Sequence, residues 1–290
     1  MNIITLPIKK KEIVFLTFGG PTSNYHKRVL ELTTQAKKSN FFTKVYGYTE
    51  QFLKNDPLFW GQNGPFILNS KRGYGYWIWK PYIIQKTLQN MNENDILIYA
   101  DAGCHLNFFM PSNNYVFNSY NTQSMERLNE YIKIVDNSNY GILSFQMEHS
   151  EYKYTKPYTL YSLCDNVDDA TSGQCMASVI ILRKNTHTKH LINEWCKYSQ
   201  LHNYINDYNI LHEQLLERNK HDKTYCEKIQ KIYDIQHNNF IDHRHDQSIF
   251  SLLVKKYGSE KIPDETNFYP NWYVDGCNFP IWCVRDRGNT

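Results

Sequence analysis

The opening of the chain constrains the fold more than any other feature of the sequence. Residues 12–18 form a continuous apolar strand pattern that ends in Gly19-Gly20-Pro21. Apolar residues then recur at helical spacing, and residues 43–48 form a second strand pattern. A strand, a helix and a strand in this order make a βαβ unit, whose usual product is a parallel sheet. We therefore expect an α/β fold that binds ligands at the carboxyl ends of its strands.

Further helix and strand patterns alternate along the rest of the chain. We expect helices at residues 81–91, 124–135, 188–199 and 247–257, and strands at residues 95–100, 140–145 and 177–182. We expect the Tyr-rich residues 152–161 to be irregular. Residues 201–239 are expected to form a polar, partly helical insertion, and the tail after residue 263 is expected to pack as coil. No internal repeat or linker divides the sequence. Residues 1–290 are thus expected to form a single domain.

Charge and cysteine content exclude several classes of protein. Lys and Arg number 32 against 29 Asp and Glu, and the basic residues form no stripe, which disfavours nucleic acid as a partner. No apolar run approaches the roughly 20 residues of a membrane span, and the amino-terminal residues lack the order of a signal peptide. The 7 cysteines include no Cys-x-x-Cys pair, which favours a reducing compartment. We expect a cytoplasmic protein, or one of the host cytoplasm if the chain is viral.

The strongest chemical signal follows the apolar strand at residues 95–100. Asp101 comes directly after this strand and is followed by the small residues Ala102 and Gly103. A carboxylate at such a strand end is able to hold a divalent cation or a ribose hydroxyl. An Asp at a strand end also commonly accepts hydrogen bonds from the N–H groups of a turn, and the spacing alone leaves both interpretations open.

Two cations lie among aromatic residues just before the helix that leads to this strand. Arg72 and Lys80 bracket two glycines and four aromatics in the sequence RGYGYWIWK. A cation beside a helix amino terminus suits a phosphate, so Arg72 and Lys80 are kept as candidates. Core packing is the favoured interpretation for most of the aromatics, and in that alternative Lys80 extends to water. If Lys80 serves a phosphate, Lys80→Ala lowers turnover far more than stability.

A third polar segment, DHRHDQS at residues 242–248, directly precedes the helical pattern at residues 247–257. Asp246 is well placed as the N-cap of that helix, but a cap needs only one acid and the segment offers more. The two histidines flanking Arg244 could supply one metal ligand, although this spacing is not diagnostic. Residues 172–178 add a small-residue entry into a strand. Signatures of P-loop NTPases, dinucleotide oxidoreductases, serine hydrolases and zincins are absent.

Taken in order, these segments resemble nucleotide-sugar glycosyltransferases of the GT-A type, most closely glycogenin-like and related retaining families. Leu16-Thr17-Phe18 and the helix after Tyr25 match the base-binding opening of those enzymes, and Trp79-Lys80-Pro81 is similar to their Ser-Lys segment. Tyr99 to Gly103 resembles the Tyr-x-Asp-x-Asp motif, with Gly103 in place of the second acid. Met176-Ala177-Ser178 and Asp246-Gln247-Ser248 are similar to the later Asn-Ala-Gly and Asp-Gln-Asp motifs.

The resemblance implies a single GT-A, Rossmann-like domain with a mostly parallel central sheet flanked by helices. Its nucleotide-binding half would span residues 12–104 and its acceptor-side half residues 105–290. The co-substrate would be a nucleoside diphosphate sugar, with a UDP-sugar favoured, and the acceptor a glycan, a protein or a lipid. Residues implied in binding the donor are Thr17, Phe18, Tyr25, Arg72, Lys80, Asp101, Ala102 and Gly103.

The resemblance also implies roles in catalysis and metal binding. Asp246 and Gln247 would face the transferring sugar, and Asp101 with His245 would hold Mn²⁺ or Mg²⁺. A retaining reaction is slightly favoured; in an inverting one, Asp246 would be the base. Because Gly103 replaces an acid, two alternatives remain open. One is a catalytically silent binding module, and the other is a metal-free site in which Lys80, Arg72, Arg285 or Arg287 neutralises the phosphates.

Overall fold

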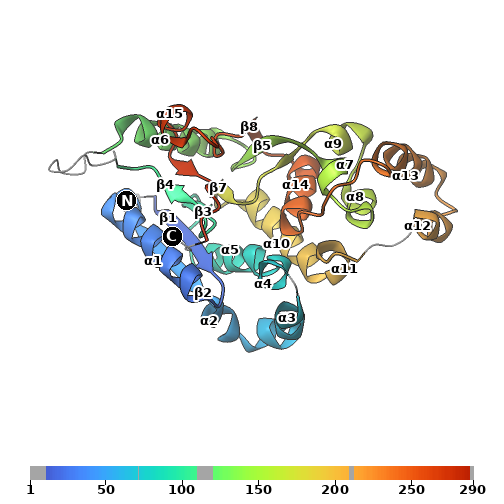
Figure 1. Cartoon of the computed structure of the whole chain (residues 1–290), viewed down its shortest axis with the longest axis horizontal. Coiled ribbons are helices and arrows are strands. Elements are labelled where there is room, and N and C mark those ends of the chain that lie inside the picture. The colour runs from blue at the N-terminus through green and yellow to red at the C-terminus, as the bar shows by residue number, and fades with distance from the viewer. Residues whose placement is uncertain (1–10, 71, 110–119, 209–211, 288–290) are drawn as a thin grey trace, which may run out of the picture.

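A seven-stranded sheet runs through the centre of the protein (Figure 1). The computed structural model describes residues 11–70, 72–109, 120–208 and 212–287. The strand order is β2 (Lys44–Thr49), β1 (Ile13–Gly19), β3 (Ile96–Ala100), β7 (Val179–Arg183), β5 (Ile142–Ser150) and β6 (Gly173–Cys175), with β8 (Glu260–Pro263) also paired to β5.

Strand direction follows from the pairings within this sheet. The pairs β1–β2, β1–β3 and β5–β8 are parallel, whereas β7 is antiparallel to both β3 and β5, and β6 is antiparallel to β5. Five of the seven strands described here therefore point the same way. The predicted α/β class with a mostly parallel central sheet is confirmed.

Helices cover both faces of the sheet, so alternate side chains of β1 enter different layers. Val14 and Leu16 pack into the layer that contains α5 (Trp79–Gln89), α10 (Thr186–Gln200) and α14 (Asp246–Tyr257). Phe15 packs into the opposite layer with α1 (Ser23–Lys38) and α6 (Thr122–Asn137). A strand buried on both faces is largely apolar, which explains the apolar run of β3 and that of β1, which only the buried Thr17 interrupts.

The segment at residues 152–161 is helical, and its prediction as an irregular excursion was wrong. It falls within α7 (Glu151–Tyr154) and α8 (Pro157–Leu163), which are followed by α9 (Val167–Thr171). Glu151 is fully buried and accepts a hydrogen bond from Lys255 at 3.0 Å. This buried ion pair ties α7 to α14, so the tyrosines pack against the core and do not form a surface loop.

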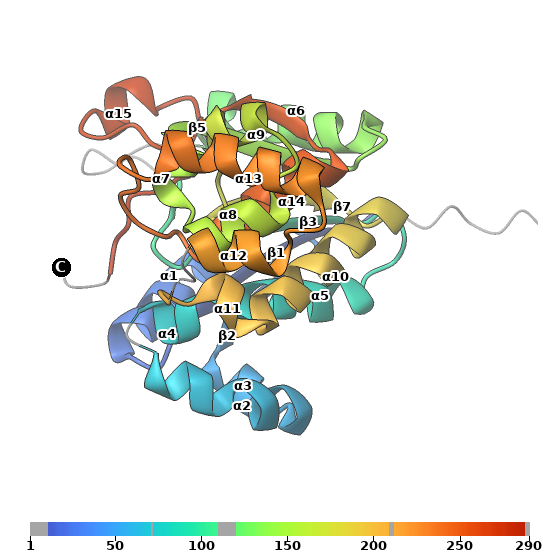
Figure 2. The same ribbon diagram turned by 90° about the vertical axis from the view of Figure 1, so that its right-hand side faces the viewer.

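The remaining connections confirm the polar insertion but change the interpretation of the tail. Residues 201–239 contain the helices α11 (His202–Ile205), α12 (His212–Arg218) and α13 (Lys223–Gln236). In another part of the molecule, α2 (Glu50–Lys54) and α3 (Pro57–Asn69) project beyond β2 (Figure 2). The tail contains α15 (Trp272–Asp275) and β9 (Ile281–Trp282), and β9 pairs with β4 (His105–Leu106). The expected coil is therefore tied by this pairing to the segment that follows β3.

None of the helices in the described ranges is long and apolar enough to cross a membrane. The division into a nucleotide-binding and an acceptor-side half stays a prediction.

Candidate functional site

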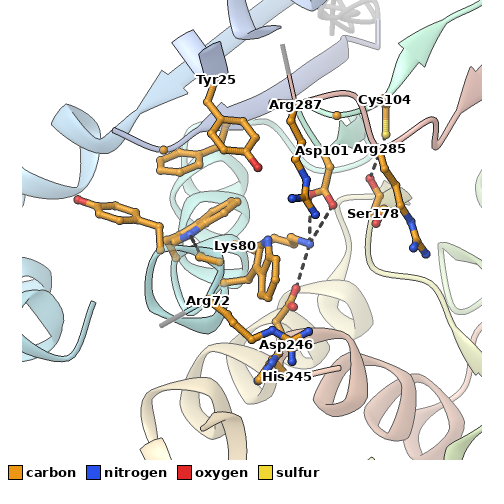
Figure 3. A pocket seen from close by; sticks show the side chains of 18 of the residues that line it. Tyr25, Arg72, Lys80, Asp101, Cys104, Ser178, His245, Asp246, Arg285 and Arg287 are labelled. Carbon is orange, nitrogen blue, oxygen red and sulfur yellow. Dashed lines mark hydrogen bonds and ion pairs between the residues drawn. The ribbon is translucent and has the colours of Figure 1, made fainter. Parts of the chain in front are cut away.

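A cavity of about 730 Å³ opens at the carboxyl ends of β1 and β3 (Figure 3). The predicted site residues that line it are Phe18, Tyr25, Arg72, Lys80, Asp101, Ala102, Gly103, His245, Asp246 and Gln247. Thr17 does not line the cavity and is fully buried, because its side chain lies in the interior of β1. The structure thus brings ten of the eleven predicted residues together, from segments far apart in the sequence.

Lys80 lies between two carboxylates at the base of this cavity. Its ammonium nitrogen is 3.1 Å from Oδ1 of Asp101 and 3.0 Å from Oδ2 of Asp246, and it donates to the carbonyl oxygen of Ala177 at 3.2 Å. Burial lowers the pKa of Lys80, but the charges of the two carboxylates outweigh this effect and leave the pKa above its usual value. Lys80 is therefore charged, buried and fully occupied, which excludes the interpretation that it extends to water.

Asp101 is held by donors from two elements. Tyr99, in β3, donates its hydroxyl to Oδ1 of Asp101 at 2.5 Å, and Lys80 donates to Oδ2 at 3.4 Å. The backbone N–H of Asp101 donates to the carbonyl oxygen of Ser178 at 2.9 Å. The carboxylate is fixed in orientation, since both of its oxygens and its backbone are engaged.

Asp246 is the first residue of α14 and not its N-cap, so the capping interpretation was wrong. The N-cap is His245, and no side chain caps the helix. The Asp246 side chain is 3% exposed, and its Oδ2 has an ionic partner in Lys80 but no well-aligned hydrogen-bond donor. Burial raises the pKa of Asp246 to about 6, against the opposing charge of Lys80. This buried, partly satisfied acid is the strongest candidate for chemistry, because perturbed acids cluster at functional sites.

Residues 73–77 form a left-handed helical turn just before α5. The φ angles are 57° at Gly73, 49° at Tyr74, 90° at Gly75, 52° at Tyr76 and 61° at Trp77. The N–H of Trp77 donates to the carbonyl oxygen of Gly73 at 3.2 Å and closes the turn. A left-handed conformation costs a non-glycine residue about 1–2 kcal/mol, whereas glycine adopts it without strain. In this turn the strain therefore falls on the three aromatic residues and not on the two glycines. Such strain concentrates at functional sites, and here it turns Tyr74 and Trp77 toward the cavity.

Gln247 is held in place at the entry to α14. Its side-chain amide donates to Oε1 of Gln174 at 2.9 Å, and its Oε1 accepts from the N–H of Ala177 at 3.4 Å. Ala177 and Ser178 belong to the small-residue entry into β7, so this segment reaches Lys80, Asp101 and Gln247 through its backbone.

His245 lines the cavity, but its Nδ1 is engaged outside the cavity, and its buried Nε2 has no hydrogen-bond partner among the described residues. Nδ1 lies 2.8 Å from the carbonyl oxygen of Ile205 and therefore carries the ring proton. Nε2 lies 3.7 Å from Asp207, which does not line the cavity. Burial lowers the pKa of His245 to about 4, so the imidazole is neutral at pH 7.

Arg72 is also engaged. Its guanidinium group donates to both oxygens of Asp242, at 3.0 and 3.2 Å. This pair is partly exposed at the rim of the cavity. The predicted role of Arg72 toward a phosphate thus requires that Arg72 share or release Asp242.

The structure adds lining residues that the sequence reasoning missed or held only as alternatives. These include Tyr74, Trp77, Ser178, Arg244, Arg285 and Arg287. Arg285 and Arg287 are exposed, and neither forms an ion pair within the described ranges. Their place at the cavity depends on the β4–β9 pairing, for which the sequence offered only two apolar residues, Ile281 and Trp282.

The side chains at the base of the cavity fit a divalent cation poorly. Within the part of the chain that the structure describes, no cluster of three or more His, Cys, Asp or Glu side chains is placed to hold a metal. Asp101 and Asp246, the two acids nearest the cavity base, share the ammonium group of Lys80. The prediction that Asp101 and His245 hold Mn²⁺ or Mg²⁺ stays a prediction.

Comparisons with known proteins give no match among family models or curated proteins. Solved structures do resemble the chain. A glycosyltransferase involved in the glycosylation of the major capsid of PBCV-1 is 13% identical, with 95% of this chain and 94% of that chain covered and a TM-score of 0.42.

Two further structures resemble the chain to a similar or smaller extent. Mouse xyloside xylosyltransferase 1 is 12% identical over 93% of this chain and 96% of that chain, with a TM-score of 0.38. An active-site mutant of LgtC is 10% identical, with 93% of this chain and 87% of that chain covered and a TM-score of 0.33.

Proposed function

We propose that this protein is a glycosyltransferase that moves a sugar from a nucleoside diphosphate donor to an acceptor hydroxyl. The observation that carries the proposal is the ionic cluster of the buried Lys80 and Asp246 with the partly exposed Asp101, at the base of a cavity whose wall carries Arg285 and Arg287 without ion-pair partners among the described residues. Acids at the base suit sugar hydroxyls, whereas guanidinium groups suit phosphates. A cavity with both groups matches a ligand that carries a sugar and a diphosphate.

Aromatic side chains on the cavity wall also suit a nucleoside diphosphate sugar. Tyr25, Tyr74 and Trp77 line the cavity, and Phe18 stacks on Trp79 with ring centroids 4.0 Å apart. Flat rings stack on nucleobases and on the apolar faces of sugars. Tyr25 lies at the start of α1, where the motif resemblance expects the nucleobase.

The chemistry follows from where charge changes during transfer. As the bond between the anomeric carbon and the phosphate oxygen breaks, negative charge builds up on the diphosphate, which cationic groups stabilise. In a retaining reaction the departing phosphate takes the acceptor's proton, and Asp246 with Gln247 positions the sugar. In an inverting reaction the ionised Asp246 takes that proton. The retaining course, the UDP-sugar and the glycan, protein or lipid acceptor remain part of this proposal, as does the cytoplasmic location.

A donor panel tests the proposal. The full chain would be incubated with UDP- and GDP-sugars, with and without Mn²⁺, and the release of nucleoside diphosphate would be measured. We expect at least one donor to be cleaved, and cleavage to be lost in Asp246→Asn. Binding of a donor without turnover in the wild type would instead identify a silent carbohydrate- or nucleotide-binding module.

A further inference from the structure

We infer that this site binds the donor's diphosphate without a divalent cation, through the guanidinium groups of Arg285 and Arg287. The inference rests on the proposed function, since it assumes that a nucleoside diphosphate enters the cavity. It concerns a carboxyl-terminal segment, residues 283–287, that packs on the turn after β3 at Gly103. Figure 3 shows Arg285 and Arg287 of this segment close to Asp101.

Lys80 already occupies the position between the two acids. The ammonium nitrogen of Lys80 is within 3.1 Å of both Asp101 and Asp246. The oxygens of Asp101 also accept from Tyr99 and Lys80. A divalent cation at Asp101 would lie next to a buried ammonium group, so it would be repelled by that charge and would compete for the same oxygens.

Gly103 lies in close contact with the carboxyl-terminal segment. A Cβ atom placed on Gly103 would lie 3.1 Å from the carbonyl oxygen of Asp286 and 3.4 Å from Cα of Arg285. The N–H of Asp286 donates to the carbonyl oxygen of Gly103 at 3.1 Å. The carboxyl-terminal segment therefore packs on the position where a second acid would stand, and it brings two arginines to that position.

Arg28 fixes this segment to the loop that carries Asp101. The Arg28 guanidinium, in α1, donates to the carbonyl oxygens of Ala102 at 3.2 Å and Cys104 at 2.6 Å. It also lies 3.2 Å from the carboxylate of Asp286. Asp286 thus anchors the segment on one side, while Arg285 and Arg287 on either side of it line the cavity.

The charge of the cavity wall favours an anion. Arg244, Arg285 and Arg287 all line the cavity. Arg285 and Arg287 form no ion pair among the described residues, and Arg244 interacts with the charge of Asp242 without forming a direct ion pair. Arg285 has a φ of 57°, a left-handed conformation that is unfavourable for an arginine and marks a constrained position. Paired guanidinium groups bind phosphate oxygens with two hydrogen bonds each and neutralise a leaving diphosphate as a metal ion would.

Calorimetry with nucleoside diphosphates tests the inference. UDP, GDP and ADP would be titrated into the full wild-type chain in EDTA, in Mg²⁺ and in Mn²⁺. The same titrations would be made with the double variant Arg285→Gln/Arg287→Gln. Arg218→Gln, at an exposed position of α12 outside the cavity, is the control. Both cavity arginines are exposed, so the double variant is expected to fold, and its melting temperature would check this.

We expect the affinity for the best nucleoside diphosphate to change less than threefold between EDTA and either cation. The double variant should lose at least tenfold in affinity, and the Arg218 control should match the wild type. Binding that requires Mg²⁺ or Mn²⁺, or an unchanged affinity in the double variant, would overturn the inference and leave the proposed function standing. If no nucleoside diphosphate binds under any condition and no donor is cleaved, the proposed function fails as well.

Discussion

The ammonium nitrogen of Lys80 lies 3.0 Å from Oδ2 of Asp246, and both side chains are almost fully buried. Lys80 stands in the first turn of α5 and Asp246 at the first position of α14, so one ion pair joins the starts of two helices in the same layer. With Asp101 as a second carboxylate partner, the cluster carries more negative than positive charge when Asp246 is ionised. Stability and activity should therefore both depend on the protonation of Asp246.

Replacing Lys80 should destabilise the protein strongly, contrary to the expectation from sequence that stability would be spared. Lys80→Met leaves the buried carboxylate of Asp246 and the partly exposed carboxylate of Asp101 without a counter-charge, and breaking a buried ion pair costs about 3–5 kcal/mol. The loss of Lys80 should raise the pKa of Asp246 further, so the difference from wild type should grow as pH rises above 6.

Urea unfolding at pH 5 and pH 8 measures this difference. The control is Lys189→Met, which removes an exposed partner of Glu93 at 2.6 Å and should cost less than about 1 kcal/mol. Equal free energies of unfolding for Lys80→Met and wild type at pH 8 would contradict the role of Lys80 in neutralising the buried acids.

The variant Asp246→Asn should distinguish the role of Asp246 in turnover from its role in stability. Because burial raises the pKa of Asp246 to about 6, the folded wild type holds this proton more tightly than the unfolded chain does. The Asp246 contribution to stability is therefore most favourable below pH 4 and falls by roughly 3 kcal/mol as pH rises through 6. The Asn variant lacks this titration, so the free energy of unfolding should depend less on pH across that window.

Donor turnover should rise with pH over the range in which the stability contribution of Asp246 falls. If the ionised carboxylate acts on the sugar or the acceptor, wild-type kcat/KM falls as pH drops below about 6, and Asp246→Asn loses about 10²–10⁴-fold at pH 7. Glu213→Gln, which replaces an exposed acid in the first turn of α12, should leave both stability and turnover unchanged. Full turnover by the Asn variant would assign Asp246 a structural role only.

The periodic segments could be predicted from the sequence because apolar spacing is a local property. The pattern of β1, α1 and β2 and the apolar run of β3 each appear close to the expected bounds. Their places beside strand ends and helix starts made Lys80, Asp101 and Asp246 separate candidates, and the resemblance to GT-A glycosyltransferases implied that they share one site. Their ionic contacts did not, since these depend on how α5 and α14 pack against each other.

The missed features depend on contacts between distant segments or on unusual backbone geometry. Arg285 and Arg287 were expected from the sequence only as an alternative, and the contacts that place them at the cavity, the β4–β9 pairing and the bonds of Asp286 to Gly103 and Arg28, join distant segments. The helical packing of residues 151–163 depends on Glu151 meeting Lys255 within the core. The left-handed turn at residues 73–77 contains three aromatics that rarely adopt positive φ, so residue preferences predict a different conformation there.

Gly73→Ala tests whether the left-handed turn is needed for binding. A Cβ atom at Gly73 would lie 2.3 Å from the ring of Trp77, and its φ of 57° disfavours alanine. The variant should lose about 1–2 kcal/mol from backbone strain, together with affinity for a nucleoside diphosphate. The matched control is Gly61→Ala, in an exposed turn of α3 with nothing within 4 Å, which should be neutral or gain up to about 1 kcal/mol. Unchanged nucleotide affinity in Gly73→Ala would show that the turn serves folding alone.

The pairing of Arg72 with Asp242 leads to a prediction about competition at the rim. The guanidinium group of Arg72 donates to Asp242 at 3.0 and 3.2 Å, and the two side chains are 43% and 37% exposed. An exposed pair of this kind contributes less than about 1 kcal/mol to stability, so neither Arg72→Gln nor Asp242→Asn should change the melting temperature appreciably.

Nucleotide affinity should change more than stability does if Arg72 serves a phosphate. Asp242→Asn would release Arg72 and raise the affinity for UDP, whereas Arg72→Gln would lower it, and the double variant would match Arg72→Gln because Asp242 acts only through Arg72. Titration of UDP into the four proteins gives this cycle. An increase in affinity that persists in the double variant would mean that Asp242 repels the phosphates directly, and no change in any variant would remove Arg72 from the donor site.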